Sequence, residues 1–143
     1  MLTPEEINEQ GTAFLPGLLG IEVLAVGQGF LESRLEVRPK LLAPNGPLHA
    51  ASVVGLADTS CGWGTLANLP DGAESFATIE LNSNFLGTAR EGFIRCEATL
   101  THGGRSTQVW DATVSEEGSG KRLALFRCTQ MILRPRPASG RDV

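Results

Sequence analysis

The sequence has no run of about 20 apolar residues that could span a bilayer, and its N-terminus lacks the basic and apolar segments of a targeting signal. Basic residues are not in excess either: 12 Lys and Arg stand against 16 Asp and Glu, for a formal net charge of −4. Because phosphate binding normally leaves a basic footprint, no nucleic acid is expected as a partner. These absences predict a cytoplasmic protein with neither a membrane nor a nucleic-acid partner.

Cysteine and histidine are scarce. Cys61, Cys96 and Cys128 lie in apolar segments, and their odd number predicts buried thiols in a reducing compartment instead of a disulfide framework. A core thiol is usually inert, so Cys61 is not expected to act as a nucleophile. The two histidines, His49 and His102, are too far apart in sequence for a zinc-ligand spacing. We expect no metal and no other cofactor.

Charge is also scarce between residues 41 and 70, where Asp58 is the only formally charged residue. The middle of this stretch is rich in Ala and Leu, lacks strict two-residue alternation and is too long for a strand, which favours a helix. The turn cluster Asn45-Gly46-Pro47 places the helix start near His49 or Ala50.

Small or apolar residues occupy every face of this helix, as expected of a helix enclosed by other structure. Gly55, Gly62 and Gly64 each disfavour the helix by about 1 kcal/mol relative to Ala. Close approach of a surrounding sheet would compensate for this cost. A lone buried carboxylate such as Asp58 is costly without a partner or a function, so Asp58 is a candidate functional residue; a carboxylate satisfied by Thr59 or by a backbone donor is the structural alternative.

The remaining patterns predict a single α+β domain over residues 1–143. Residues 1–16 contain a capping box, Thr3-Pro4-Glu5-Glu6, and a helix that ends at Gly11. Alternation and turn signals predict strands at 17–26, 30–37, 77–85, 94–101, 109–115 and 121–133, the last buried on both faces, and a mobile tail at 134–143. One curved antiparallel sheet of five to six strands, wrapped around the long helix, would bury that helix. This arrangement is the hotdog fold.

Residues 47–59 resemble the His-Gly-Gly segment of the PaaI-type hotdog thioesterases, in which an acidic residue follows the His by nine positions, as Asp58 follows His49. Residues 78–86, 90–92 and 102–107 resemble three later segments of that family, the last being a hairpin beside coenzyme A. The resemblance covers roughly residues 17–133. It implies an acyl- or aryl-CoA thioesterase that is a dimer or a tetramer, with sites at the dimer interface. The sequence departs from the family in Ala50-Ala51, which replaces Gly-Gly, and in Ala43, which replaces a polar residue.

Thioester hydrolysis needs a donor for the developing oxyanion and a carboxylate that attacks or activates water. The Ala50 N–H at the helix N-terminus fits the first role and Asp58 the second, as nucleophile or as general base. The two residues are eight positions apart, about 12 Å along a helix, so one carbonyl group cannot contact both. We therefore expect Ala50 of one subunit to face Asp58 and Thr78 of its partner. The resemblance implies that Thr78 helps to hold the attacking water.

His49 either takes part in catalysis or only caps the helix. Phe85 is either core or acyl pocket, and the hairpin residues either meet coenzyme A phosphates or form a solvated turn. The candidate substrate- and coenzyme A-binding residues are Asn45, as a substitute for the missing polar group, and Ala51, Gly62, Phe85, His102, Arg105, Ser106 and Arg136. Two other functions stay open: a dehydratase or hydratase on the same fold, with His49 as base, and a non-catalytic acyl-CoA binding or sensing protein.

Overall fold

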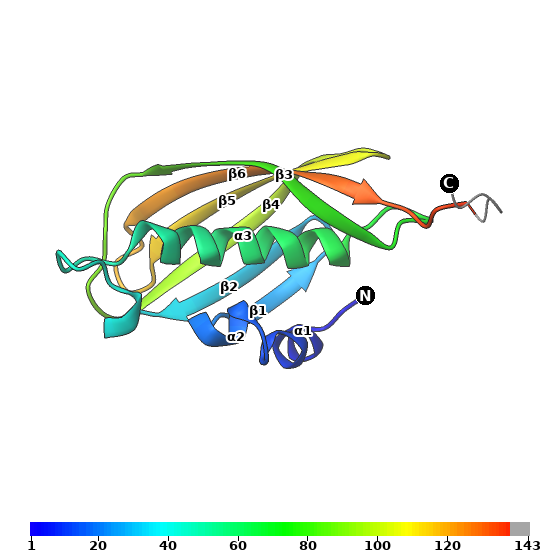
Figure 1. Ribbon diagram of the computed structural model, residues 1–143. Helices are drawn as coiled ribbons and strands as arrows, with labels where there is room; N and C mark the ends of the chain where they lie inside the picture. Colours follow the sequence, from blue (N-terminus) through cyan, green and yellow to red (C-terminus); the bar gives the residue numbers. More distant parts are fainter. Residues whose placement is uncertain (138–143) are drawn as a thin grey trace, which may run out of the picture.

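The computed structural model describes residues 1–137 and forms one antiparallel sheet curved around a long helix (Figure 1). The strands are ordered β1-β2-β4-β5-β6-β3, and α3 lies across the concave face of the sheet. This is the predicted α+β hotdog fold with six strands. The elements are α1 (Pro4–Gly11), α2 (Leu15–Leu19), β1 (Glu22–Gly27), β2 (Phe30–Glu36), the 3₁₀ turn η1 (Pro39–Leu41), α3 (Ala50–Ala67), β3 (Ser75–Phe85), β4 (Phe93–Gly103), β5 (Thr107–Glu116) and β6 (Arg122–Leu133).

The N-terminal segment confirms one prediction and corrects another. The capping box of α1 is formed, because the Thr3 Oγ1 accepts from the Glu6 N–H and the Glu6 carboxylate accepts from the Thr3 N–H. The predicted strand over residues 17–26 is wrong in its first part, since residues 15–19 form α2. Pro16 favours a helical start, and Gly20, with φ of 75°, ends the helix. The strand β1 begins only at Glu22.

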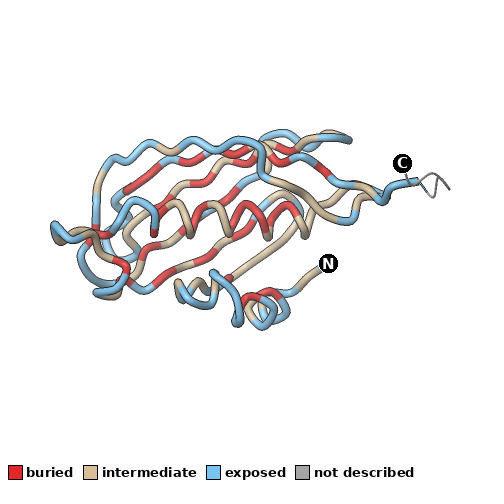
Figure 2. The backbone as a smooth tube through the Cα atoms, in the orientation of Figure 1, coloured by how far each residue is buried: buried red, intermediate tan, exposed pale blue. Residues whose placement is uncertain are grey.

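The central helix α3 begins at Ala50, as predicted, and packs its buried face against the sheet (Figure 2). Two of its glycines make the expected close approach to strands: a Cβ at Gly62 would lie 3.0 Å from the Phe76 ring, and a Cβ at Gly64 would lie 2.8 Å from the Trp110 ring. Gly55 differs, because its near neighbour is Leu19 of α2 and not the sheet.

Enclosure of α3 is incomplete in the described chain. Its side away from the sheet, which carries Val54, Gly55 and Asp58, is only half-buried. The core lies between the sheet and the opposite side of the helix, and includes Trp110 together with all three cysteines, which are free thiols as expected. Within residues 1–137, no helix is both long and apolar enough to cross a membrane.

The last strand, β6, is not buried on both faces as predicted. Its residues alternate, and Leu125, Met131 and Leu133 point away from the core with about two fifths of their surface exposed. The neighbouring strand β3 ends the sheet, and it also exposes large apolar side chains, including Ile79 and Leu81. The predicted tail extends past the described residues: 138–143 lie outside them, and the expected mobility stays a prediction.

Gly64→Ala is expected to lower the free energy of unfolding by about 1–2 kcal/mol. The new Cβ would meet the fully buried Trp110 ring, and overpacking of this kind costs about 1–3 kcal/mol, offset in part by about 1 kcal/mol of helix propensity. Denaturant unfolding measures the change, with Gly118→Ala as the control because nothing lies within 4 Å of a Cβ there. A Gly64→Ala midpoint equal to that of the wild type would contradict the close-contact explanation.

Candidate functional site

His49 caps the N-terminus of α3. Its Nδ1 accepts a hydrogen bond of 2.9 Å from the Ala51 N–H. A ring nitrogen that accepts carries no proton, so the proton of the neutral ring is on Nε2. The structural role considered for His49 is therefore present, and it leaves the Nε2–H as a donor on the exposed side of the cap.

Ala50 is the first residue of α3 and is exposed. Its N–H has no acceptor among the residues that the structure describes, whereas the next three N–H groups all bond to His49. An unsatisfied N–H at a helix N-terminus, reinforced by the helix dipole, is suited to bind a developing negative charge. The methyl group of Ala50 does not remove this donor.

Asp58 lies on the half-buried side of α3. Its Oδ1 is buried and has no hydrogen-bond partner within the described part of the chain. Loss of solvent around the carboxyl group raises its pKa above the ordinary value. Neither Thr59 nor a backbone donor satisfies this oxygen within residues 1–137, as the structural alternative requires.

Thr78 lies on β3, and its hydroxyl donates a 2.7 Å hydrogen bond to Oε1 of Gln130 on β6. This bond leaves the lone pairs of the Thr78 oxygen free to accept. Gln130 is fully buried, and its Nε2 has no partner among residues 1–137. Sequence reasoning missed Gln130, although a polar residue at an inward position between Cys128 and Ile132 is an unusual feature of an apolar strand.

Two apolar grooves flank the N-terminus of α3. The first, about 200 Å³, brings Phe85 of β3 beside Ala50, with Leu123 in its wall. Phe85 is 48% exposed and is thus not part of the core. The second groove, about 380 Å³, runs between α2 and α3 and includes His49, Ala51 and Gly55. The structure therefore places Phe85 and Ala51 on either side of the same helix end.

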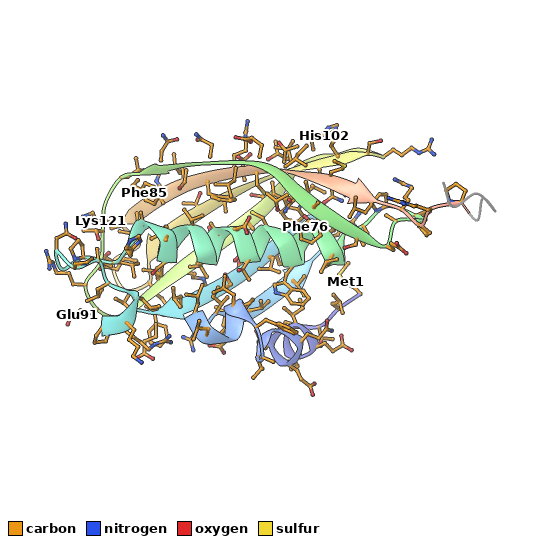
Figure 3. All side chains as sticks on the ribbon, viewed as in Figure 1. Met1, Phe76, Phe85, Glu91, His102 and Lys121 are labelled. Carbon is orange, nitrogen blue, oxygen red and sulfur yellow. The ribbon has the colours of Figure 1, made fainter. Side chains whose placement is uncertain are left out.

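The basic hairpin, residues 102–107 at the turn between β4 and β5, lies at the end of the molecule opposite the N-terminus of α3 (Figure 3). His102, Arg105 and Ser106 are exposed, and Arg134 ties the hairpin to the turn after α3 by donating to the carbonyl oxygens of Arg105 and Asp71. Arg136 is also exposed. In one chain these residues are therefore near the C-terminus of α3 and away from Ala50.

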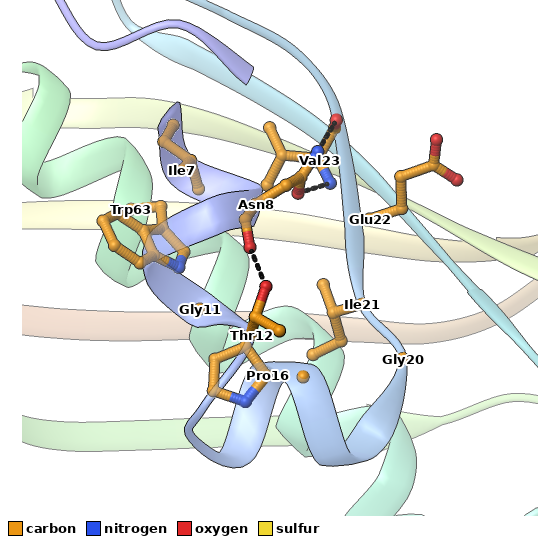
Figure 4. A pocket seen from close by; sticks show the side chains of 11 residues that line it. Ile7, Asn8, Gly11, Thr12, Pro16, Gly20, Ile21, Glu22, Val23 and Trp63 are labelled. Carbon is orange, nitrogen blue, oxygen red and sulfur yellow. Dashed lines mark hydrogen bonds between the residues drawn. The ribbon is translucent and has the colours of Figure 1, made fainter. Parts of the chain in front are cut away.

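The other sequence-predicted residues have different places. Asn45 is exposed in the turn before α3, and Gly62 is buried against Phe76 of β3. A further cavity of about 320 Å³ lies between α1, α2 and Trp63 (Figure 4). Asn8 forms one wall of it by bonding the N–H and the carbonyl of Val23. None of the sequence-predicted site residues lines this cavity.

Known proteins resemble this chain in sequence and in fold. The 1,4-dihydroxy-2-naphthoyl-CoA hydrolase of Listeria monocytogenes is 34% identical over 82% of this chain and 94% of its own length. The crystal structure of a thioesterase from Haemophilus influenzae matches with a TM-score of 0.89 and 27% identity, covering 96% of this chain and 95% of that one. The Escherichia coli PaaI protein, 21% identical, shares the fold over 91% of both chains with a TM-score of 0.80.

A profile of one family covers residues 45–122, which include all of α3, β3, β4 and β5. That segment holds the helix N-terminus, Asp58 and Thr78. The matching family is the Thioesterase superfamily. The chain belongs to this superfamily and is a thioester hydrolase with the hotdog fold.

Proposed function

We propose that the protein hydrolyses acyl- or aryl-CoA thioesters to the free acid and coenzyme A, at sites shared between two subunits. One observation carries the proposal: within residues 1–137, α3 holds an unpartnered N–H at Ala50 and an unpartnered carboxylate oxygen at Asp58, about 12 Å apart along the helix. Two such groups serve one thioester only when they come from different chains. A relative named as a naphthoyl-CoA hydrolase supports a coenzyme A thioester as the substrate.

The proposed dimer places two α3 helices antiparallel about a two-fold axis. If Ala50 faces Asp58 of the partner subunit, the axis passes close to Val54, midway between them. The half-buried side of α3 around Val54 would then be covered by the second copy. The strand β3 is an uncovered sheet edge of 11 residues that also exposes apolar side chains. Such an edge favours association with a strand of another copy, which supports assembly into a dimer. Pairs of dimers would form the tetramer.

In the proposed reaction, the thioester oxygen accepts a hydrogen bond from the Ala50 N–H, and the Nε2–H of His49 is a second donor at the same helix end. Asp58 of the partner subunit has two roles open to it. As general base it takes a proton from water while the water oxygen attacks the carbonyl carbon. As nucleophile it attacks that carbon itself and forms a mixed anhydride, which water then hydrolyses.

In either case the C–S bond breaks and the coenzyme A thiolate leaves and takes up a proton. The Thr78 oxygen, whose own proton is donated to Gln130, accepts a hydrogen bond from the water. The antiparallel arrangement also moves the partner's basic hairpin to the N-terminus of α3. His102, Arg105, Ser106 and Arg136 would there bind coenzyme A phosphates. The reaction as proposed needs no metal or cofactor.

A panel of thioesters tests the proposed function. Thiol release is expected from at least one acyl-CoA in a series from acetyl-CoA to decanoyl-CoA, extended with benzoyl-CoA and phenylacetyl-CoA. The two methyl groups of Ala50-Ala51 narrow the approach to the helix end, which keeps a non-catalytic acyl-CoA binding protein as the alternative. Such a protein would show tight acyl-CoA binding and no thiol release. That result would contradict the proposal and favour the acyl-CoA binding function.

A further inference from the structure

The groove between α2 and α3 is built for hydrocarbon. Leu15 and Leu19 of α2 form one wall, Ala51 and Gly55 of α3 form the other, and Leu41 and Leu42 close it. Its polar lining residues are Lys40, His49 and Ser52, and the hydroxyl of Ser52 donates to the carbonyl oxygen of Leu41 at 2.9 Å. A pantetheine arm has amide groups that need hydrogen-bond partners, whereas an alkyl chain needs none.

The direction of the groove also suits the acyl group. This step depends on the proposed function, in which the partner's basic hairpin receives coenzyme A beyond the N-terminus of α3. The acyl group is bonded to the other side of the thioester carbon and therefore extends the opposite way. The groove starts at His49 and continues along α3 as far as Gly55, away from that hairpin.

Gly55 and Leu19 meet in the lining of the groove. A glycine inside a helix is unfavourable, and a Cβ here would come within 2.8 Å of Cδ1 of Leu19. The end of Leu19 therefore packs directly onto Gly55, in the space that a side chain would take. We propose that this groove binds the acyl chain of an aliphatic acyl-CoA, and that the contact between Leu19 and Gly55 sets the longest chain that fits.

Two substitutions test the proposal in opposite directions. Wild-type kcat/KM is expected to rise with each added methylene by up to about fourfold, until the groove is full. Leu19→Ala enlarges the groove, so the chain length with the highest kcat/KM is expected to increase by about two methylenes. Gly55→Ala pushes Leu19 into the groove, so that optimum is expected to shorten.

Leu18→Ala is the matched control, because Leu18 is on the same helix, is 74% exposed and does not line the groove. Its optimum is expected to equal that of the wild type. Optima that do not move in Leu19→Ala and Gly55→Ala, with thiol release retained, would overturn the acyl groove and leave the proposed function standing. A wild type that releases thiol from no member of the series would instead overturn the proposed function. Thermal melting of each variant verifies that it is folded.

Discussion

Asp58→Asn is expected to lower kcat for thioester hydrolysis by about 10²- to 10⁴-fold, the usual contribution of a positioned carboxylate that accepts a proton. The amide has nearly the same shape as the carboxyl group but neither attacks a thioester nor takes a proton from water. Thiol release at saturating acyl-CoA measures the effect. Glu9→Gln makes the same chemical change at an exposed position on α1, and its kcat is expected to equal that of the wild type. Asp58→Asn with near-normal turnover would show that the carboxylate is not catalytic.

The same substitution is expected to raise the melting temperature at neutral pH. Desolvation raises the pKa of Asp58 in the folded protein, so the folded state holds the proton more tightly than the unfolded state. The stability linked to this proton is complete below about pH 4 and is lost as the pH rises through the folded pKa. The gain from Asp58→Asn is thus present at pH 7 and shrinks toward pH 4. If hydrogen bonds satisfied the Asp58 carboxylate in the folded protein, Asp58→Asn would instead lower the melting temperature at neutral pH.

Ala50→Pro is expected to lower kcat by about 10²- to 10³-fold, the usual effect of removing one oxyanion donor. Proline has no N–H, yet it is well tolerated at the first position of a helix. The residue before it must be extended, and His49 already has φ of −65° and ψ of 137°. The substitution therefore deletes the donor and leaves α3 formed, which circular dichroism and thermal melting can verify.

Ala50→Gly is the control for Ala50→Pro. It keeps the N–H and restores the first glycine of the family's Gly-Gly pair, so thiol release is expected to persist. If Ala50→Pro retains wild-type kcat, the oxyanion donor is a different group, and the Nε2–H of His49 becomes the next to test.

The elements that could be predicted from sequence are those with strong local signals. Asn45-Gly46-Pro47 fixed the start of α3, and the capping box fixed the start of α1. The helix α2 was missed because the apolar run after Gly17 is compatible with a strand, and the helix signals there, Pro16 and Gly20, mark a helix of only five residues. The burial of β6 was overestimated because one sequence does not reveal that its outer face is open to solvent.

The candidate site was predictable where it depends on spacing along one helix. Ala50 and Asp58 share α3, so their distance follows from helix geometry. Gln130 was not predictable, because its bond to Thr78 depends on the register of β3 against β6, which includes a bulge between Thr78 and Glu80. The α2–α3 groove was equally hidden, since it needs a helix that the sequence pattern did not indicate.

The shared site is the central claim, and co-expression of Asp58→Asn and Ala50→Pro subunits tests it most directly. A mixed dimer would combine the intact Ala50 N–H of the first chain with the intact Asp58 carboxylate of the second, and so regain one of its two sites. With random pairing, thiol release is expected to return to about a quarter of the wild-type value, although each variant alone is nearly inactive. A mixture no more active than the separate variants would show that both residues act within one chain, and would contradict the account.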